Sequence, residues 1–349
     1  MSALLFLDSF DHYSTSQAHR KWTTGTPNAI NSANGRTGNG ANIGTFGNIS
    51  KTLGQEYLTM ACGMAYKTQG YGQDPIAFAS DIGLSASFGT NGDGRYFFEC
   101  AAGSTAPSTF VLNIGEWYYI ELYVTVTITT IDANHFTAAY DGLIRVNENT
   151  IASGSFSHTV TYSGSTTGRG FSQLHLTGSG GSSNSSVDDL YLTDGELLGD
   201  VKIGVLYPNA AGDSAGWTPN AAGANYTKVM EHSADDDTTY NSAGTTGLKD
   251  LYNLDNIDPA FTGTIKGVQA LWCVKKSDEG SASVKGVWKS GSTEITQSSG
   301  LNYVAPNGYP PSATDYLYSI EPERKSLFTM ADWTMAEIDA LQLGITRTV

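Results

Sequence analysis

Residues 117–129 alternate between two sets of side chains, and this pattern constrains the fold more than any other. One set is apolar or aromatic and comprises Tyr118, Ile120, Leu122, Val124, Val126 and Ile128. The other is mixed and comprises Trp117, Tyr119, Glu121, Tyr123, Thr125, Thr127 and Thr129. Because successive side chains of a strand point to opposite faces, this period of two predicts a long strand that is buried on one side.

Shorter segments of the same kind occur along the whole chain. Residues 95–100 and 135–146 are expected to be strands, the second with a turn at Asp141-Gly142. Strands at 174–176 and 189–192 are expected to flank a Gly/Ser-rich loop at 178–186. Later in the chain the strand candidates are 201–206, 267–274, 283–288 and 316–320.

The segment 187–195 resembles the closing strand of a sandwich and ends a little past the midpoint of the 349 residues. A chain of this length is too long for one ordinary core. We therefore predict an all-β fold of two tandem β-sandwich domains, residues 1–198 and 199–349. Leu190 and Leu192 are expected to face inward, with Asp188 and Asp189 at the exposed start of the strand.

A short helix is expected at the C-terminus. Thr334 and Glu337 have the spacing of a capping box, and Trp333 and Ile338 can form a hydrophobic staple around it. Leu341 is expected to continue the apolar face of the helix, and Gly344 is expected to supply the left-handed stop.

Composition excludes several partners. The formal net charge is −15, whereas attraction to nucleic acid or to an anionic membrane requires the opposite sign. The first residues have no basic start and Asp8 ends their apolar run, so no export signal is predicted. No apolar run approaches the length of a membrane span. Only 15 % of the residues are charged, so Ser, Thr, Asn and Gly are expected to cover the surface.

Cysteines and histidines give no metal-binding pattern. Cys62, Cys100 and Cys273 are odd in number and lack metal-type spacing. Cys62 is expected on one buried strand face with Leu58, Met60, Met64 and Tyr66, so its thiol is predicted to be buried. This usage fits folding in a reducing cytosol. The six histidines show no paired spacing, so no zinc site and no cofactor are expected.

Two acidic runs are weak calcium candidates. Asp235, Asp236 and Asp237 supply oxygen ligands, but without EF-hand spacing an exposed acidic turn is the favoured interpretation. For Asp188 and Asp189, the start of a strand is likewise favoured over an ion site.

Aromatic side chains share one face of the long predicted strand. Trp117, Tyr119 and Tyr123 form a row that can stack on sugar rings or pack against another surface. Packing at an interface is favoured, because large apolar patches usually mark interfaces.

A sequence near the C-terminus resembles a catalytic signature. Glu337, Asp339 and Gln342 occupy the positions of the Glu-x-Asp-x-x-Glu motif of a jelly-roll glycoside hydrolase family. Gln342 cannot donate a catalytic proton, and a helix would direct Glu337 and Asp339 to nearly opposite sides. We therefore expect no enzymatic activity from this motif.

Several segments, taken in order, resemble a recurring virion protein of tailed bacteriophages with an N-terminal concanavalin A-like, laminin G-like domain. The similarity covers nearly the whole chain and is carried by residues 8–13, 21–22, 35–40, 50–53, 115–121, 187–195, 198–202, 216–219, 235–240 and 333–345.

The resemblance implies a structural component of the particle, in the tail fibre or tail tip, that contacts other virion proteins and copies of itself. It implies no catalytic residues, and folding in the host cytoplasm before assembly. Three alternatives remain open. The first is an adhesin that binds a host-surface glycan through loops such as 178–186 or the one carrying Tyr71, Gln73 and Asp74. The second is a capsid decoration protein, and the least favoured is a polysaccharide depolymerase.

Overall fold

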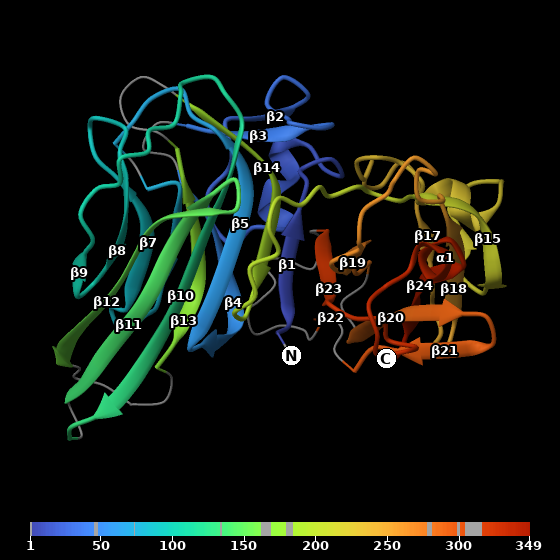
Figure 1. Ribbon diagram of the computed structural model, residues 1–349. Coiled ribbons are helices and arrows are strands. Elements are labelled where there is room, and N and C mark those ends of the chain that lie inside the picture. Colours follow the sequence, from blue (N-terminus) through green and yellow to red (C-terminus); the bar gives the residue numbers. More distant parts are fainter. Residues whose placement is uncertain are drawn as a thin grey trace. The chain divides into compact units, whose positions relative to one another are not determined.

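The computed structural model describes residues 2–44, 48–72, 74–132, 135–161, 169–178, 184–277, 281–298, 301–303 and 316–349. Its contacts divide the chain into two compact units, Met1–Ile203 and Gly204–Val349. Nearly all of the regular structure is strand, as predicted (Figure 1).

The strands of the first unit are β1 (Leu4–Asp8), β2 (Ala29–Asn31), β3 (Gly40–Ile43), β4 (Asn48–Tyr57), β5 (Thr59–Lys67), β6 (Ile76–Ala79), β7 (Ser85–Thr90), β8 (Tyr96–Cys100), β9 (Gly103–Ser104), β10 (Tyr118–Thr130), β11 (His135–Val146), β12 (Asn149–Thr161), β13 (Phe171–Thr177) and β14 (Ser185–Thr193). A 3-10 helix, η1 (Thr15–Arg20), follows β1.

These strands form two sheets. The larger has eight strands in the order β12-β11-β10-β5-β14-β3-β2, with β1 also paired to β14. The smaller has six strands in the order β4-β13-β6-β7-β8-β9. Strands that follow one another in the chain are paired in the runs β2-β3, β6-β7-β8-β9 and β10-β11-β12. The closing strand β14 instead pairs with β1, β3 and β5 from early in the chain, inside the larger sheet (Figure 1).

The core of the first unit lies between the two sheets. The buried face of β10 is the one that its alternation predicted: Ile120, Leu122 and Val124 are fully buried. The smaller sheet contributes buried side chains such as Phe78 and Leu174 from the opposite side. The unit is therefore a β-sandwich.

Three details of the strand predictions were wrong. Asp141 and Gly142 do not form a turn but lie inside β11, paired with Thr125 and Val124 of β10. Leu58, expected on the buried face with Cys62, is exposed in the turn between β4 and β5. Residues 201–206 are not a strand. The thiol of Cys62 is buried, as predicted.

The second unit contains β15 (Pro208–Ala215), β16 (Thr218–Pro219), η2 (Asn225–Lys228), β17 (Asn241–Ser242), β18 (Lys249–Leu254), β19 (Val268–Val274), β20 (Ala282–Ser290), β21 (Thr293–Thr296), β22 (Leu301–Tyr303), β23 (Leu317–Glu323), α1 (Met335–Asp339) and β24 (Leu341–Arg347). A six-stranded sheet has the order β15-β18-β24-β20-β21, with β22 also paired to β20. Two separate two-stranded sheets, β19-β23 and β16-β17, complete the second unit.

The core of the second unit is rich in tryptophan. Trp288 and Trp333 are buried and stack with ring centroids 6.0 Å apart. Trp272 meets Trp288 edge to face at 6.4 Å. Ala270 of β19 and Leu341 of β24 belong to the same cluster, so the small sheet β19-β23 packs on the larger sheet.

The C-terminal helix begins as predicted but ends earlier. The hydroxyl of Thr334 accepts a hydrogen bond from the amide of Glu337, and the capping box is complete. However, α1 ends at Asp339 and Leu341 starts β24, which lies between β18 and β20. Gly344 is therefore not a helix stop. It lies in a strand where an added Cβ would meet the carbonyl oxygen of Asp250 at 1.8 Å.

Among the described residues, no helix is long and apolar enough to cross a membrane.

Candidate functional site

The predicted aromatic row on β10 does not form one exposed surface. Tyr119 is only 1 % exposed, and its ring stacks on that of Tyr191 with centroids 6.4 Å apart. Trp117 is half-buried beside the ammonium group of Lys67, 4.8 Å from the ring centroid. Tyr123 is half-buried and its hydroxyl bonds to a neighbouring threonine. Tyr119 therefore has no free face for a sugar ring.

Tyr119 is covered because the chain folds back after β14. Leu198 and Val201 pack with Tyr119 and Tyr191 on the outer face of the larger sheet. Gly63 of β5 makes room for the two tyrosine rings, since an added Cβ would lie 2.4 Å from the Tyr191 ring and 2.8 Å from the Tyr119 ring.

A row of cross-strand partners fixes this returning segment. Tyr191 of β14, Gly63 of β5 and Glu121 of β10 lie side by side. The hydroxyl of Tyr191 donates a hydrogen bond to Oε1 of Glu121 and accepts one from the amide of Leu198 at 2.9 Å. The same Oε1 accepts a hydrogen bond from the amide of Gly199 at 3.0 Å. Glu121 is fully buried, and burial raises its pKa.

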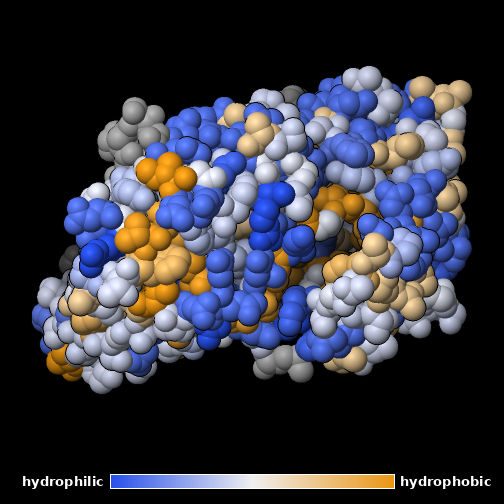
Figure 2. Space-filling model, turned by 45° about the horizontal axis from the view of Figure 1, so that its top comes forward, coloured by the Kyte–Doolittle hydropathy of each residue, from blue (hydrophilic) through white to orange (hydrophobic). Residues whose placement is uncertain are grey.

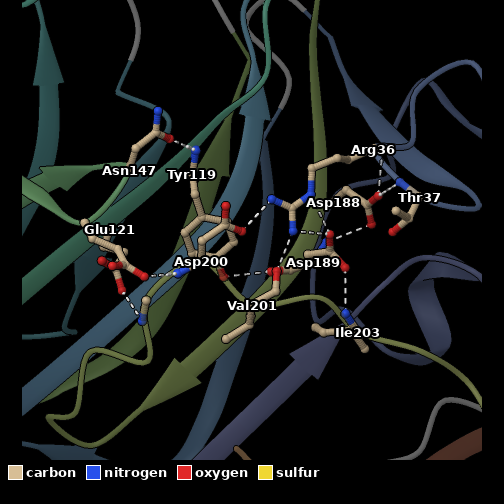
Figure 3. Close-up of polar contacts among 12 residues, drawn as sticks. Arg36, Thr37, Tyr119, Glu121, Asn147, Asp188, Asp189, Asp200, Val201 and Ile203 are labelled. Atoms are coloured by element: carbon tan, nitrogen blue, oxygen red, sulfur yellow. Dashed lines mark hydrogen bonds and ion pairs between the residues drawn. The ribbon is translucent and has the colours of Figure 1, made fainter. Parts of the chain in front are cut away.

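The two acids of the predicted closing strand are fully buried, contrary to the expectation of an exposed strand start. The sheet register shifts between Asp188 and Tyr191, and Asp189 has a φ of 49°. This bulge turns consecutive carboxylates toward one loop, residues 35–40 (Figure 3).

Arg36 is the centre of that loop network (Figure 3). Its guanidinium pairs with Asp189 at 2.8 Å and with Asp200 at 2.6 Å, and it donates a hydrogen bond to the carbonyl of Val201. The amides of Arg36 and Thr37 donate to the carboxylate of Asp188 at 2.7 and 3.1 Å.

The network contains two buried carboxylates and one guanidinium. Burial raises the pKa of Asp188 to about 7, and repulsion from Asp189 adds to this effect, although backbone amides oppose it. Burial also raises the pKa of Asp189. The amide of Ile203 and the charge of Arg36 lower this pKa, but they offset the effect of burial only in part. The amide of Ile203 donates to Asp189 at 2.7 Å, so the network also holds the last residue of the first unit.

A second buried network surrounds Asp8. Its carboxylate accepts hydrogen bonds from Lys21 at 3.1 Å, from the hydroxyl of Tyr13 at 2.6 Å and from the indole of Trp22 at 2.8 Å. Burial alone would raise the pKa of Asp8, but Lys21, His12, the hydroxyl of Tyr13 and the amide of Phe10 lower it below its usual value. Burial lowers the pKa of His12, which lies 3.1 Å from Lys21, to about 3. These hydrogen bonds connect strand β1 to residues 13–22.

The calcium candidates of the second unit point to separate partners. Asp235 accepts a hydrogen bond from the amide of Thr239 at 3.0 Å, and Asp237 pairs with Lys275 at 2.8 Å. Asp236 has a φ of 60°, as expected in a tight turn. In the described ranges no three His, Cys, Asp or Glu side chains group as a metal site.

The residues of the glycoside hydrolase-like motif also have separate partners. Glu337 accepts a hydrogen bond from Ser326 at 2.8 Å, and Asp339 accepts one from the amide of Ile257 at 2.9 Å. Gln342 accepts one from the amide of Asp213 at 2.9 Å. The residues of this motif therefore connect separate segments of the second unit.

The predicted glycan loop lies over the outer face of the smaller sheet. Asp74 accepts hydrogen bonds from the hydroxyl of Ser87 at 2.9 Å and the amide of Thr90 at 3.1 Å, both on β7. The hydroxyl of Tyr71 donates to the carbonyl of Leu112 at 2.8 Å. Gln73 lies outside the described residues, as do residues 179–183 of the other predicted loop.

The outward side chains of that sheet form registered rows. One row runs from His175 of β13 through Ala77 and Ser87 to Glu99 of β8. Beside it, the ring of Phe97 lies against Gly89, where an added Cβ would meet the ring at 2.5 Å. On this face the middle strands β6 and β7 carry small side chains, and the flanking strands β13 and β8 carry larger ones.

Two acids of the second unit, Asp250 of β18 and Glu321 of β23, are buried without any signal in the sequence. Glu321 of β23 is 5 % exposed and accepts a hydrogen bond from the indole of Trp288 at 3.1 Å. Its other oxygen has no hydrogen-bond partner among the described residues. Burial raises its pKa to about 7. The segment Glu321-Pro322-Glu323 gave no signal of burial, because it appears polar.

No protein-family model matches this chain. No curated protein matches it in sequence. Solved structures resemble it only distantly. Domain 4 of a GH43 extracellular arabinanase from Geobacillus stearothermophilus, in complex with arabinotriose, is 15 % identical over 56 % of this chain and 93 % of that chain, with a TM-score of 0.37. The PL-14 alginate lyase from Aplysia kurodai is 8 % identical over 47 % and 85 %, with a TM-score of 0.30.

Domains LG4-5 of the mouse laminin alpha1 chain are 12 % identical over 87 % of this chain and 72 % of that chain, with a TM-score of 0.27. Likenesses at this level carry no argument about function. The strand order and the buried faces define the class: an all-β protein built from sandwich domains.

Proposed function

We propose that this protein is a non-enzymatic structural component of a tailed bacteriophage particle, located on the tail. The observation that supports this most is the Arg36 network. It joins three of the segments that carry the resemblance to phage virion proteins, residues 35–40, 187–195 and 198–202. A fourth and a fifth, residues 8–13 and 21–22, meet in the Asp8 network.

These motif residues act within the fold. Asp8, Asp188 and Asp189 are fully buried and hydrogen-bonded to side chains or amides of their own unit. Residues that maintain a scaffold in this way suit a passive component, whereas a depolymerase requires carboxylates that converge on a substrate.

Exposed apolar side chains supply surfaces for assembly. In the first unit Leu58, Ile114 and Ile131 are each more than half exposed, at 53 %, 52 % and 56 %. Figure 2 shows hydrophobic residues gathered in patches between polar ones on the visible face of the molecule. Such patches are typical of proteins that contact partners.

Labelling of intact particles tests the proposal. Antibodies raised against the purified protein should bind to tails when particles are imaged by electron microscopy. Binding to heads would instead identify a capsid decoration protein. Particles that carry no label, and whose purified proteins contain no peptide of this chain, would overturn the virion assignment.

A second candidate function is recognition of a host-surface glycan on the outer face of the smaller sheet. The half-buried ring of Phe97 and the exposed carboxylate of Glu99 lie beside small residues of β7. An apolar ring with a few nearby polar groups is a common composition for a ligand site. On a glycan array, a signal that Phe97→Ala abolishes and that the exposed Thr127→Ala on the other sheet retains would support this function. A blank array would exclude it.

A further inference from the structure

The larger sheet of the first unit ends in an unusually long strand. Among the described residues, the two sheets of this unit have five edge strands: β12, β2, β1, β4 and β9. Three of these are short, since β1 has 5 residues, β2 has 3 and β9 has 2. β4 has 10 residues, but it carries Lys51 and Glu56 and is partly covered by a bridge between Ser50 and Thr24. β12 has 13 residues.

β12 carries none of the features that usually protect an edge. Its sequence, NTIASGSFSHTVT, contains no Asp, Glu, Lys, Arg or Pro. Edge strands in soluble proteins are commonly short, charged, interrupted by proline or covered by another segment, because their free amides and carbonyls pair readily with other strands. The exposed side chains of β12 are small and hydroxylated, Ser153, Ser155, Ser157 and Thr159 among them.

The strand is nevertheless held firmly from its own side. It pairs with β11 from His135–Thr161 to Val146–Asn149, with one irregularity. Its inner face packs on the smaller sheet, where Phe156 meets Phe98 with ring centroids 6.2 Å apart. Within the described part of the chain, β12 pairs with no strand other than β11. The far edge thus presents an ordered row of backbone groups.

We propose that this edge pairs in antiparallel fashion with β12 of a second copy of the chain, related by a two-fold axis. The two larger sheets would then form one continuous sheet across the dimer. An antiparallel pair of identical strands is self-complementary, as a two-fold interface requires.

Charge restricts where a second copy can approach. Each chain carries a net charge of −15, so two copies repel each other over most of their surfaces. Backbones can approach within about 4.8 Å only where the side chains bring no like charges together. β12 meets this condition over its whole length.

Light scattering after size exclusion tests the proposal with the full chain. The wild-type protein should have twice the 37.0 kDa mass of one chain. In the double variant Ser153→Lys/Ser157→Lys, pairing centred on Ser155 would place residue 153 of one copy opposite residue 157 of the other. The resulting like charges should weaken self-association by at least about tenfold.

The matched control is Thr127→Lys/Thr129→Lys. It adds the same charge to exposed positions of β10, which β11 separates from the edge at β12, and should leave the dimer intact. Hydrogen exchange provides a second measurement, because amides of β12 should be protected in the wild type and exchange faster in the β12 variant. A monomeric wild type, or a β12 variant that is folded and keeps the wild-type mass, would overturn the proposal.

Discussion

Arg36 and Asp189 form an ion pair of 2.8 Å in which the carboxylate is fully buried and the guanidinium side chain is 15 % exposed. The same guanidinium reaches Asp200, which is 46 % exposed. Arg36 therefore links a buried bulge of β14 to the segment that follows it.

Replacing Arg36 should be costly. Arg36→Met removes the partner of a buried carboxylate, and such changes typically lower the free energy of unfolding by about 3–5 kcal/mol. Urea unfolding followed by tryptophan fluorescence measures the loss. The control is Asp132→Asn, which removes an exposed pair with His135 and should cost less than about 1 kcal/mol. Equal effects of the two changes would contradict the assigned role.

Gly63 should not tolerate a side chain. Gly63→Ala would place a Cβ 2.4 Å from the ring of Tyr191, so the ring must move and we expect a loss of about 1–3 kcal/mol. Gly54 of β4 is a matched control, because nothing lies within 4 Å of its added Cβ. Gly54→Ala should change stability by less than about 1 kcal/mol. Chemical unfolding of both variants distinguishes the two sites.

The hydroxyl of Tyr191 should hold the returning segment in place. Tyr191→Phe leaves the buried Oε1 of Glu121 without one donor and the amide of Leu198 without its acceptor, a loss of about 1–3 kcal/mol. Hydrogen exchange at Leu198 should accelerate. Tyr123→Phe, at a half-buried tyrosine, should leave that amide unchanged. Unaltered protection of Leu198 in Tyr191→Phe would refute this role.

The second unit should lose stability as the pH rises. The pKa of Glu321 is about 7 in the folded chain and 4.5 in its ordinary state, so the folded chain binds its proton more tightly. The stability that this proton contributes, at most about 3 kcal/mol, is complete below the ordinary pKa and disappears as the pH passes through 7.

Thermal unfolding at about pH 5 and about pH 8.5 measures this dependence. Glu321→Gln cannot ionise and should show a smaller difference between the two conditions. Asp258→Asn removes a carboxylate from an exposed position and should keep the wild-type difference. If Glu321→Gln retains that difference in full, the buried carboxyl is not its source.

Periodicity predicted the parts of the fold that depend on one strand at a time. The alternation of residues 117–129 identified β10 and its buried face, and the capping box located the start of α1. The end of α1 was missed because Leu341 fits either an apolar helical face or a strand. Only pairing with β18 and β20 decides for the strand.

The Arg36 network could not be predicted, because its members are distant in sequence. Arg36 and Asp189 are separated by 153 positions, and nothing near either residue signals the other. A pair of adjacent aspartates normally indicates an exposed position. Here a bulge with a positive φ turns both carboxylates inward, and local sequence does not reveal it.

The amide of Ile203 bonds to Asp189, and Leu198 and Val201 shield Tyr119. A chain shortened to end at Ile203 would keep this covering, whereas one ending at Leu198 would lose the carbonyl of Val201, the carboxylate of Asp200 and part of the apolar lid. The five residues after Leu198, although irregular in backbone, thus belong to the architecture of the sandwich that precedes them.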